Sequence, residues 1–312
     1  MTVFGLCPVR LVGMALFCIS AGLDGIASEE RAVTAGADAS FSPDGRKVLF
    51  QRSVGHDIHI GITDLCGGDT IWVWKGEGRA FFPAWAPDGS VVYSYMGKQR
   101  TAYAGWKAND GEDGANLYHW CRGERRRLTK GRHFDVQPAI SADGRIVYFT
   151  STSPYDMSKP IYRDHPYKEG AVVMSMPLDG TARPVPVTSL TPPMFGLADP
   201  QPSPNGERLA IARLDGYFSA WRIVTSSLSA PDVMTYETPQ DMVAYSPSWR
   251  PDGRAIAFTG YRVGDPGWGA YVKDLKTGAL TRIATGENPS WSPDGQTLIY
   301  ERDGTVYAKG VR

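Results

Sequence analysis

A short turn motif recurs six times along the chain and constrains the fold more than any other feature. Its consensus is an aromatic or apolar residue followed by Ser-Pro-Asp-Gly or a close variant. The six copies are Phe41–Gly45, Trp85–Gly89, Ile140–Gly144, Pro202–Gly206, Trp249–Gly253 and Trp291–Gly295. Asp or Asn followed by Gly is a strong signal for a β-hairpin, because Gly and Asn tolerate a positive φ. Each repeat therefore contains a hairpin.

The spacing of the repeats predicts the architecture. Successive glycines of the motif are 44, 55, 62, 47 and 42 residues apart, and periods of roughly 40–50 residues with several short strands are typical of β-propeller blades. A β-prone run such as Val91–Tyr95 follows each glycine, then a third segment such as Asp57–Leu65 and a fourth such as Arg126–Thr129. We therefore predict an all-β fold, a six-bladed β-propeller with four antiparallel strands in each blade.

The two ends of the chain are predicted to complete one blade. The sixth repeat ends at Arg312 after a strand at 305–309 and has no fourth strand. Near the start, Arg31–Gly36 (RAVTAG) matches Thr281–Gly286 (TRIATG), the fourth segment of the fifth repeat. We expect this N-terminal strand to close the last blade and to leave no unpaired edge. Residues 29–312 then form a single propeller domain.

The repeat resembles that of the TolB-like β-propellers. The shared unit is (Pro)-x-Trp-Ser-Pro-Asp-Gly followed by apolar and aromatic positions, and it covers residues 31–312. The resemblance implies a periplasmic six-bladed propeller that serves as a protein-binding platform of the Tol–Pal envelope system. TolB carries an α/β domain ahead of its propeller, for which this sequence leaves no room. Similar propellers precede the catalytic domain of prolyl-oligopeptidase-like enzymes and form the body of oligogalacturonide lyases.

The N-terminus has the pattern of an export signal. Arg10 precedes the apolar run Leu11–Leu23, and the small residues Ala27 and Ser28 follow. This is the order of a secretory signal peptide, and 13 apolar residues are too few for a membrane span, which needs about 20. We predict a signal peptide at residues 1–28 and a periplasmic or secreted location. An uncleaved anchor is the alternative.

The balance of charged residues argues against nucleic acid as a binding partner. The chain has 33 Lys and Arg against 33 Asp and Glu, whereas nucleic-acid-binding proteins usually carry a basic excess. No later stretch is long and apolar enough to span a bilayer. We therefore expect a monomer that binds a protein or cell-envelope ligand, with a carbohydrate as a further option, and no nucleic acid.

Two cysteines remain after the signal. Cys66 and Cys121 fall in equivalent turns of adjacent repeats. Strands lie about 4.8 Å apart, which separates these turns by roughly 15–20 Å. A disulfide needs Cα atoms within about 7 Å. We predict two unpaired thiols.

Signs of catalytic chemistry are few. The sequence has no Gly-x-Ser-x-Gly, His-Glu-x-x-His, Cys-x-x-Cys or phosphate-binding loop. His56 and His59 are three apart in a predicted strand, so they point to opposite faces, and we place both on a solvated surface. His119 starts a turn and is given no special role. A lyase of the oligogalacturonide type would use a histidine-rich metal cluster in the channel, and His133 and His165 are too scattered to predict one.

Three tryptophans occupy the same position of the repeat. They are Trp85, Trp249 and Trp291, each directly before the Ser-Pro-Asp-Gly turn or its variant. A stacking platform for a ligand is one interpretation of such residues. Their identical position instead predicts packing between blades.

Two long loops supply the candidate binding residues. They span residues 97–115 and 151–170, at the same position of consecutive repeats. Long loops in a compact array are often functional, and aromatic and Arg side chains commonly anchor interfaces. The alternative is that the aromatics only hold each loop in place. The candidates are Arg100, Tyr103, Trp106, Lys107, His133, Tyr155, Tyr162, Arg163, His165 and Tyr167.

No cofactor is expected. Asp110, Glu112 and Asp113 could offer carboxylates to calcium, but their spacing does not match an EF-hand loop. A solvated acidic turn is the preferred interpretation. The main hypothesis is an exported, non-enzymatic binding platform. The alternative is a carbohydrate-active enzyme, similar to oligogalacturonide lyase, that acts in the central channel; an accessory subunit of a separate enzyme is a third.

Overall fold

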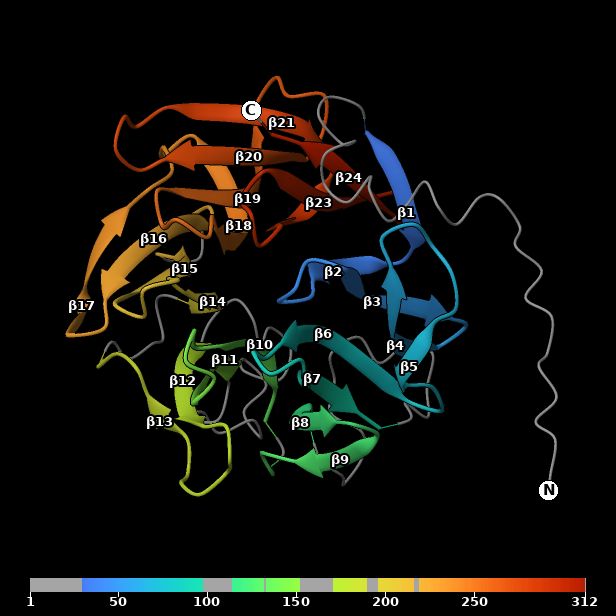
Figure 1. The fold of residues 1–312 in the computed structure, drawn as a ribbon. Helices are drawn as coiled ribbons and strands as arrows, with labels where there is room; N and C mark the ends of the chain where they lie inside the picture. Colours follow the sequence, from blue (N-terminus) through green and yellow to red (C-terminus); the bar gives the residue numbers. More distant parts are fainter. Residues whose placement is uncertain are drawn as a thin grey trace, which may run out of the picture.

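The fold is built from β-strands arranged around a common centre (Figure 1). The computed structural model describes residues 30–97, 114–131, 133–151, 171–189, 196–215 and 219–311. Within these ranges every regular element is a strand and there is no helix, hence none that could span a membrane. The predicted all-β propeller arrangement of four-stranded antiparallel sheets is confirmed.

Four sheets contain four antiparallel strands each. From the inner to the outer strand they are β10 (Asp135–Ile140), β11 (Ile146–Ser151), β12 (Val172–Pro177) and β13 (Val185–Pro186); β14 (Gly196–Pro202), β15 (Arg208–Leu214), β16 (Arg222–Ser227) and β17 (Ala230–Tyr236); β18 (Met242–Trp249), β19 (Ala255–Arg262), β20 (Gly269–Asp274) and β21 (Leu280–Thr285); and β22 (Glu287–Trp291), β23 (Thr297–Arg302), β24 (Thr305–Gly310) and β1 (Arg31–Ala35).

The remaining sheet has eight strands. They are β2 (Ala37–Phe41), β3 (Lys47–Val54), β4 (Asp57–Asp64), β5 (Ile71–Trp74), β6 (Arg79–Trp85), β7 (Val91–Met96), β8 (Asn116–Cys121) and β9 (Glu124–Arg127). Strands β2–β5 form one antiparallel run and β6–β9 another. A single parallel pair, Ile58 with Arg79, joins the two runs.

The N-terminal strand β1 completes the sheet of the C-terminal strands, as the sequence predicts. Arg31 pairs with Ala308 and Ala35 with Thr305, and the two strands lie side by side in Figure 1. An ion pair between Glu30 and Arg302, with 2.7 Å between carboxylate and guanidinium, lies beside this pairing. The ring is therefore closed by residues from opposite ends of the described chain.

Side-chain hydrogen bonds explain the Ser-Pro-Asp-Gly turn. In the first copy the Ser42 hydroxyl donates to Asp44 (2.6 Å) and accepts the N–H of Lys47 (2.9 Å). Gly45 lies at φ 71°, which favours glycine. The same Ser-to-Asp or Ser-to-Asn bond recurs at Ser141–Asp143, Ser203–Asn205 and Ser292–Asp294. The motif therefore specifies its own tight turn.

The tryptophans pack between repeats, as predicted. Trp249 is 8% exposed, and its indole N–H donates to the Gln201 carbonyl of the preceding repeat at 2.9 Å. Trp291 is 7% exposed. Trp85 makes the equivalent bond to the Ser40 carbonyl (3.3 Å) but is only half-buried, because its ring also lines open space described below.

Two histidine predictions are wrong. His59 is buried, not solvated, because the ring of Trp72 on β5 covers it edge-on, with 5.7 Å between ring centroids. His119 lies within β8, and its Nε2 is 2.7 Å from the Ser90 hydroxyl. Cys66 and Cys121 are both free thiols, as predicted, the first exposed and the second half-buried.

Candidate functional site: the central channel

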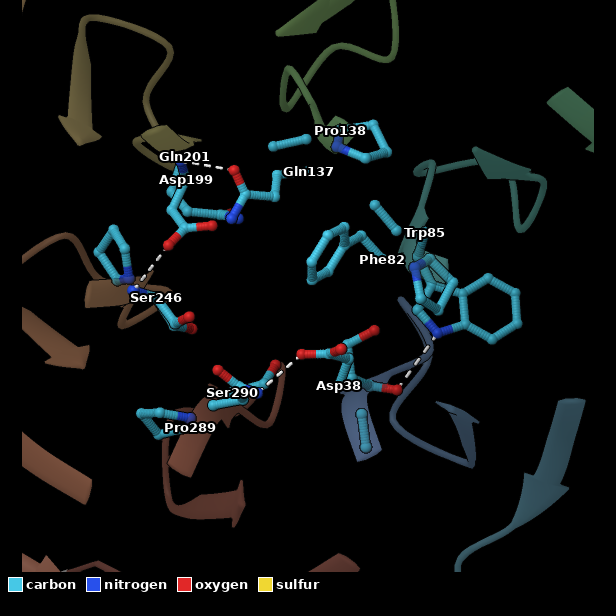
Figure 2. Close-up of a pocket in the computed structure, with 18 of the residues that line it drawn as sticks. Asp38, Phe82, Trp85, Gln137, Pro138, Asp199, Gln201, Ser246, Pro289 and Ser290 are labelled. Carbon is cyan, nitrogen blue, oxygen red and sulfur yellow. Dashed lines mark hydrogen bonds between the residues drawn. The ribbon is translucent and has the colours of Figure 1, made fainter. Parts of the chain in front are cut away.

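The inner strands of all six repeats surround a cavity of about 270 Å³ at the centre of the ring (Figure 2). The strands are β2, β6, β10, β14, β18 and β22. Each contributes the short segment that begins just before the repeated proline position and runs toward the turn motif. Equivalent segments of the six repeats therefore meet around one axis.

A β-bulge turns one residue of each inner strand toward this cavity. The ladder register shifts at this point in every inner strand, and bulges commonly redirect a side chain. A positive φ is uncommon for residues other than glycine, yet all six bulge residues adopt one. They are Asp38 (45°), Phe82 (51°), Gln137 (54°), Asp199 (51°), Ser246 (51°) and Asn288 (51°).

Proline follows the bulge residue in five of the six repeats. Proline has no N–H, so it costs the ladder no hydrogen bond where the register is already broken. The repeated proline is therefore tolerated in an inner strand because it lies at the bulge.

At four of the six junctions the N–H of the bulge residue is bonded by a side chain of the preceding repeat. In these four that side chain comes six residues after the motif glycine, on the second strand. The pairs are Glu301 with Asp38 (2.5 Å), Gln51 with Phe82 (2.9 Å), Thr150 with Asp199 (3.2 Å) and Thr259 with Asn288 (2.7 Å).

The second and fourth repeats depart from this pattern. The second has Tyr95 at that position, and its hydroxyl donates to the Glu77 carbonyl. The fourth has Ala212, whose side chain cannot accept a hydrogen bond. The carboxylate of Asp199 accepts the N–H of Ser246 instead, at 3.1 Å. Asp199 is therefore both a bulge residue and the partner of the next bulge.

Carboxyl and amide groups meet on one side of the channel. The Asn288 side-chain amide donates to Asp38 (2.7 Å) and to Glu301 (3.2 Å). The Tyr245 hydroxyl donates to Glu287 nearby. Figure 2 shows the carboxyls of Asp38 and Asp199 and the ring of Phe82 at the open centre. The channel wall is thus acidic and rich in acceptors.

The surroundings of these carboxyls raise their pKa values. Burial, and then the neighbouring Glu301, Asp199 and Glu287, raise the pKa of Asp38 well above its usual range. Burial raises the pKa of Asp199 to about 6, although the Ser246 N–H opposes this rise. Burial also raises the pKa of Glu301 to about 6. These carboxyls therefore ionise around neutral pH at a cost in free energy. A bound cation would reduce that cost.

The lining residues limit the chemistry. No His, Lys, Arg or Cys lies among the described residues that line the channel. Nor do the described parts of the chain contain three or more His, Cys, Asp or Glu side chains placed to hold a metal ion. The channel can accept hydrogen bonds and hold a cation, and a protonated carboxyl of raised pKa can donate a proton.

The channel lining contains none of the described residues that the sequence analysis singled out for binding. Nine of the ten candidate binding residues, all except His133, and the calcium candidates Asp110, Glu112 and Asp113 lie outside the described residues. His133 is half-buried and does not line the channel; its ring packs over Gly131. The structure therefore does not join His133 to the channel.

Sequence reasoning missed the channel residues, although a signal was present. The bulge position comes immediately before the repeated proline, and five of its six residues are polar or acidic. A column of polar residues at one repeat position predicts a polar axis, because equivalent positions of a ring face the same centre.

The fold is similar to that of TolB-like β-propellers. No family model matches the chain, and no curated protein matches it. Among solved structures, TolB from Acinetobacter baumannii is 16% identical with a TM-score of 0.62, covering 94% of this chain and 67% of its own.

Two further solved structures are similar. A putative TolB from Agrobacterium tumefaciens is 17% identical with a TM-score of 0.62, and 91% of each chain is covered. An oligogalacturonate lyase in complex with manganese is 14% identical with a TM-score of 0.57, covering 91% of this chain and 93% of its own. At such identities the likeness shows the fold alone.

Proposed function

We propose that this protein is an exported, non-enzymatic six-bladed propeller that binds a positively charged segment of a protein or envelope ligand in its central channel. The observation that carries the proposal is the acidic channel wall of Asp38 and Asp199, with Glu301 bonded to Asp38 and Asn288 behind it and no described basic side chain along the wall. Buried carboxylates are stabilised by an opposite charge. A lysine or arginine side chain fits that requirement.

The strand order supports six blades. The eight-stranded sheet consists of two antiparallel four-stranded runs, and Ile58–Arg79 is the single strand-ladder pair between them in the described residues. Counted as two blades, these runs and the four separate sheets equal the six copies of the turn motif. The signal-like N-terminus and the TolB-like fold support a periplasmic or secreted location.

A carbohydrate-active enzyme is the second candidate function. Asp199 and Glu301 have pKa values of about 6, and a carboxyl of raised pKa suits a general acid. Against it, an oligogalacturonate is itself a polyanion, which an acidic channel would repel. None of the described histidines lines the channel.

The test is the binding of a labelled pentalysine peptide, followed by fluorescence anisotropy. We expect saturable binding at pH 7.5 that the triple variant Asp38→Asn, Asp199→Asn, Glu301→Gln weakens at least tenfold. A control triple variant removes the same charge from exposed positions: Asp69→Asn, Glu124→Gln and Asp303→Asn. An equal loss of peptide affinity in both triple variants would mean that only the net charge matters, and it would overturn the proposal.

A parallel assay measures the release of reducing ends from oligogalacturonate and from neutral oligosaccharides. Release that the channel variant abolishes and the control variant retains would favour the enzyme. We expect no release from either.

A further inference from the structure

A second cavity lies on the face of the ring that carries the turn motifs, and Trp85 lines both this cavity and the channel. It has a volume of about 390 Å³ and lies between the first and second repeats. Pockets of about 300–1,000 Å³ that combine apolar walls with a few polar groups are typical of small-molecule sites. We call it the inter-repeat cleft; residues of β4, β5, β8 and the first two turn motifs line it.

At the cleft the first two turns do not pack against each other. At the next junction the Pro87 ring lies 3.6 Å from the Cβ position of Gly144, and at the ring closure Pro293 lies 3.5 Å from that of Gly45. Between the first two repeats, no atom lies within 4 Å of the Cβ position of Gly89. The same contact is absent at Gly206 and Gly253, so the side chains that line the cleft, rather than the open turn alone, distinguish this junction.

The walls of the cleft are apolar and incompletely covered. Trp85 and Trp120 line it and are half-buried. Ile71 lies at the cleft with 49% of its surface exposed. Apolar surface left in contact with water favours a ligand that covers it, at roughly 25 cal/mol per Å². A flat ligand with one apolar face can stack on such indole rings.

Polar groups of both signs stand at the same cleft. Asp44 and Asp88 each use one carboxylate oxygen in the turn, where hydroxyl bonds from Ser42 and Ser90 lower their pKa values and keep them ionised. Their second oxygens accept no hydrogen bond from the described residues. The ammonium of Lys47 likewise has no hydrogen-bond or ion-pair partner in the described parts of the chain.

This combination selects the class of ligand. An anion would face two carboxylates, and a cation would face Lys47. A neutral ring with several hydroxyls can donate to Asp44 and Asp88 and accept from Lys47, because a hydroxyl does both. The C–H face of a pyranose also stacks on indole. We propose that the inter-repeat cleft is a binding site for a neutral hexopyranose unit, in addition to the channel site.

The probes are methyl glucopyranoside, methyl galactopyranoside, methyl mannopyranoside and N-acetylglucosamine. Binding is measured by saturation-transfer NMR and by calorimetry with the purified full chain. We expect at least one of the four to bind, and Trp120→Ala to weaken that binding at least tenfold. Lys47→Met is the second variant, since it keeps the backbone bond to Ser42 and removes only the ammonium; we expect it to weaken binding at least threefold.

Two controls separate the cleft from the rest of the molecule. Trp268→Ala removes a half-buried indole that contacts Tyr245 and lies outside the cleft, and Lys276→Met removes an exposed ammonium. Both should bind as the wild type does, and so should the triple channel variant. Binding of none of the four sugars overturns the proposal. Unchanged affinity in Trp120→Ala and Lys47→Met, or loss of binding in the channel variant, also overturns it.

Discussion

Replacing Asp199 with Asn should change how the stability of the ring depends on pH. Burial raises the pKa of Asp199 to about 6 from a usual value of 3.8. The folded protein therefore holds this proton at pH values where the unfolded chain has released it. Between about pH 4 and pH 6 the free energy of unfolding must fall as the pH rises. Asparagine does not titrate, so the variant lacks this contribution.

The magnitude follows from the shift. A rise of about two pKa units corresponds to a cost of about 3 kcal/mol once the group is ionised at pH 7. Asparagine keeps a carbonyl oxygen for the N–H of Ser246, and it tolerates the φ of 51° found at this position. Above pH 7 the variant should be more stable than the wild type by up to about 3 kcal/mol. Below pH 4 the two should coincide.

Urea denaturation between pH 4 and pH 8 measures this difference. Asp303→Asn is the matched control, because Asp303 is exposed and also has a positive φ (51°). Its curve should follow that of the wild type. Parallel pH profiles for the wild type and Asp199→Asn would refute the reasoning, and so would a variant less stable than the wild type at pH 8.

Three further predictions test the fold. Deleting residues 30–36 removes β1 and should lower the melting temperature, since β24 loses its partner; an unchanged temperature would contradict the closure. Trp249→Ala should cost about 3–5 kcal/mol as a core deletion, and Trp85→Ala clearly less because its ring is half-buried; urea denaturation giving equal costs would exclude this account. In the native protein Cys66 should react with a thiol reagent faster than Cys121, because Cys66 is exposed and Cys121 is half-buried. Mass spectrometry of the denatured, unreduced protein should find both labelled, and an unlabelled pair would reveal a disulfide.

The strand pattern could be predicted from the sequence because it depends on interactions between residues close together in the chain. The turn motif specifies its own hydrogen bonds within five residues, as Ser42 and Lys47 illustrate. The closing strand could also be predicted, because Arg31–Gly36 repeats a sequence pattern present elsewhere in the chain.

The channel depended on contacts between distant residues. The bond between the Asp38 N–H and Glu301 spans 263 positions, and no local sequence pattern predicts it. His59 was misplaced because Trp72, which covers it, belongs to a different strand. The loop residues, among them Trp106 and Tyr162, lie outside the described residues, so their role in binding stays a prediction.

The pairing of β1 with β24 also dictates an order of events in folding. Glu30 and Tyr300, which are hydrogen-bonded beside this pair, are 270 positions apart. Closing a chain loop of that length costs about 5 kcal/mol of entropy by the (3/2)RT ln n relation. A ribosome or an export channel releases β1 well before β24, so β1 must wait, unpaired, while the strands between them emerge. The ring therefore cannot reach its final stability blade by blade: a chain truncated before Thr305 keeps an open strand edge, however well its other sheets have formed.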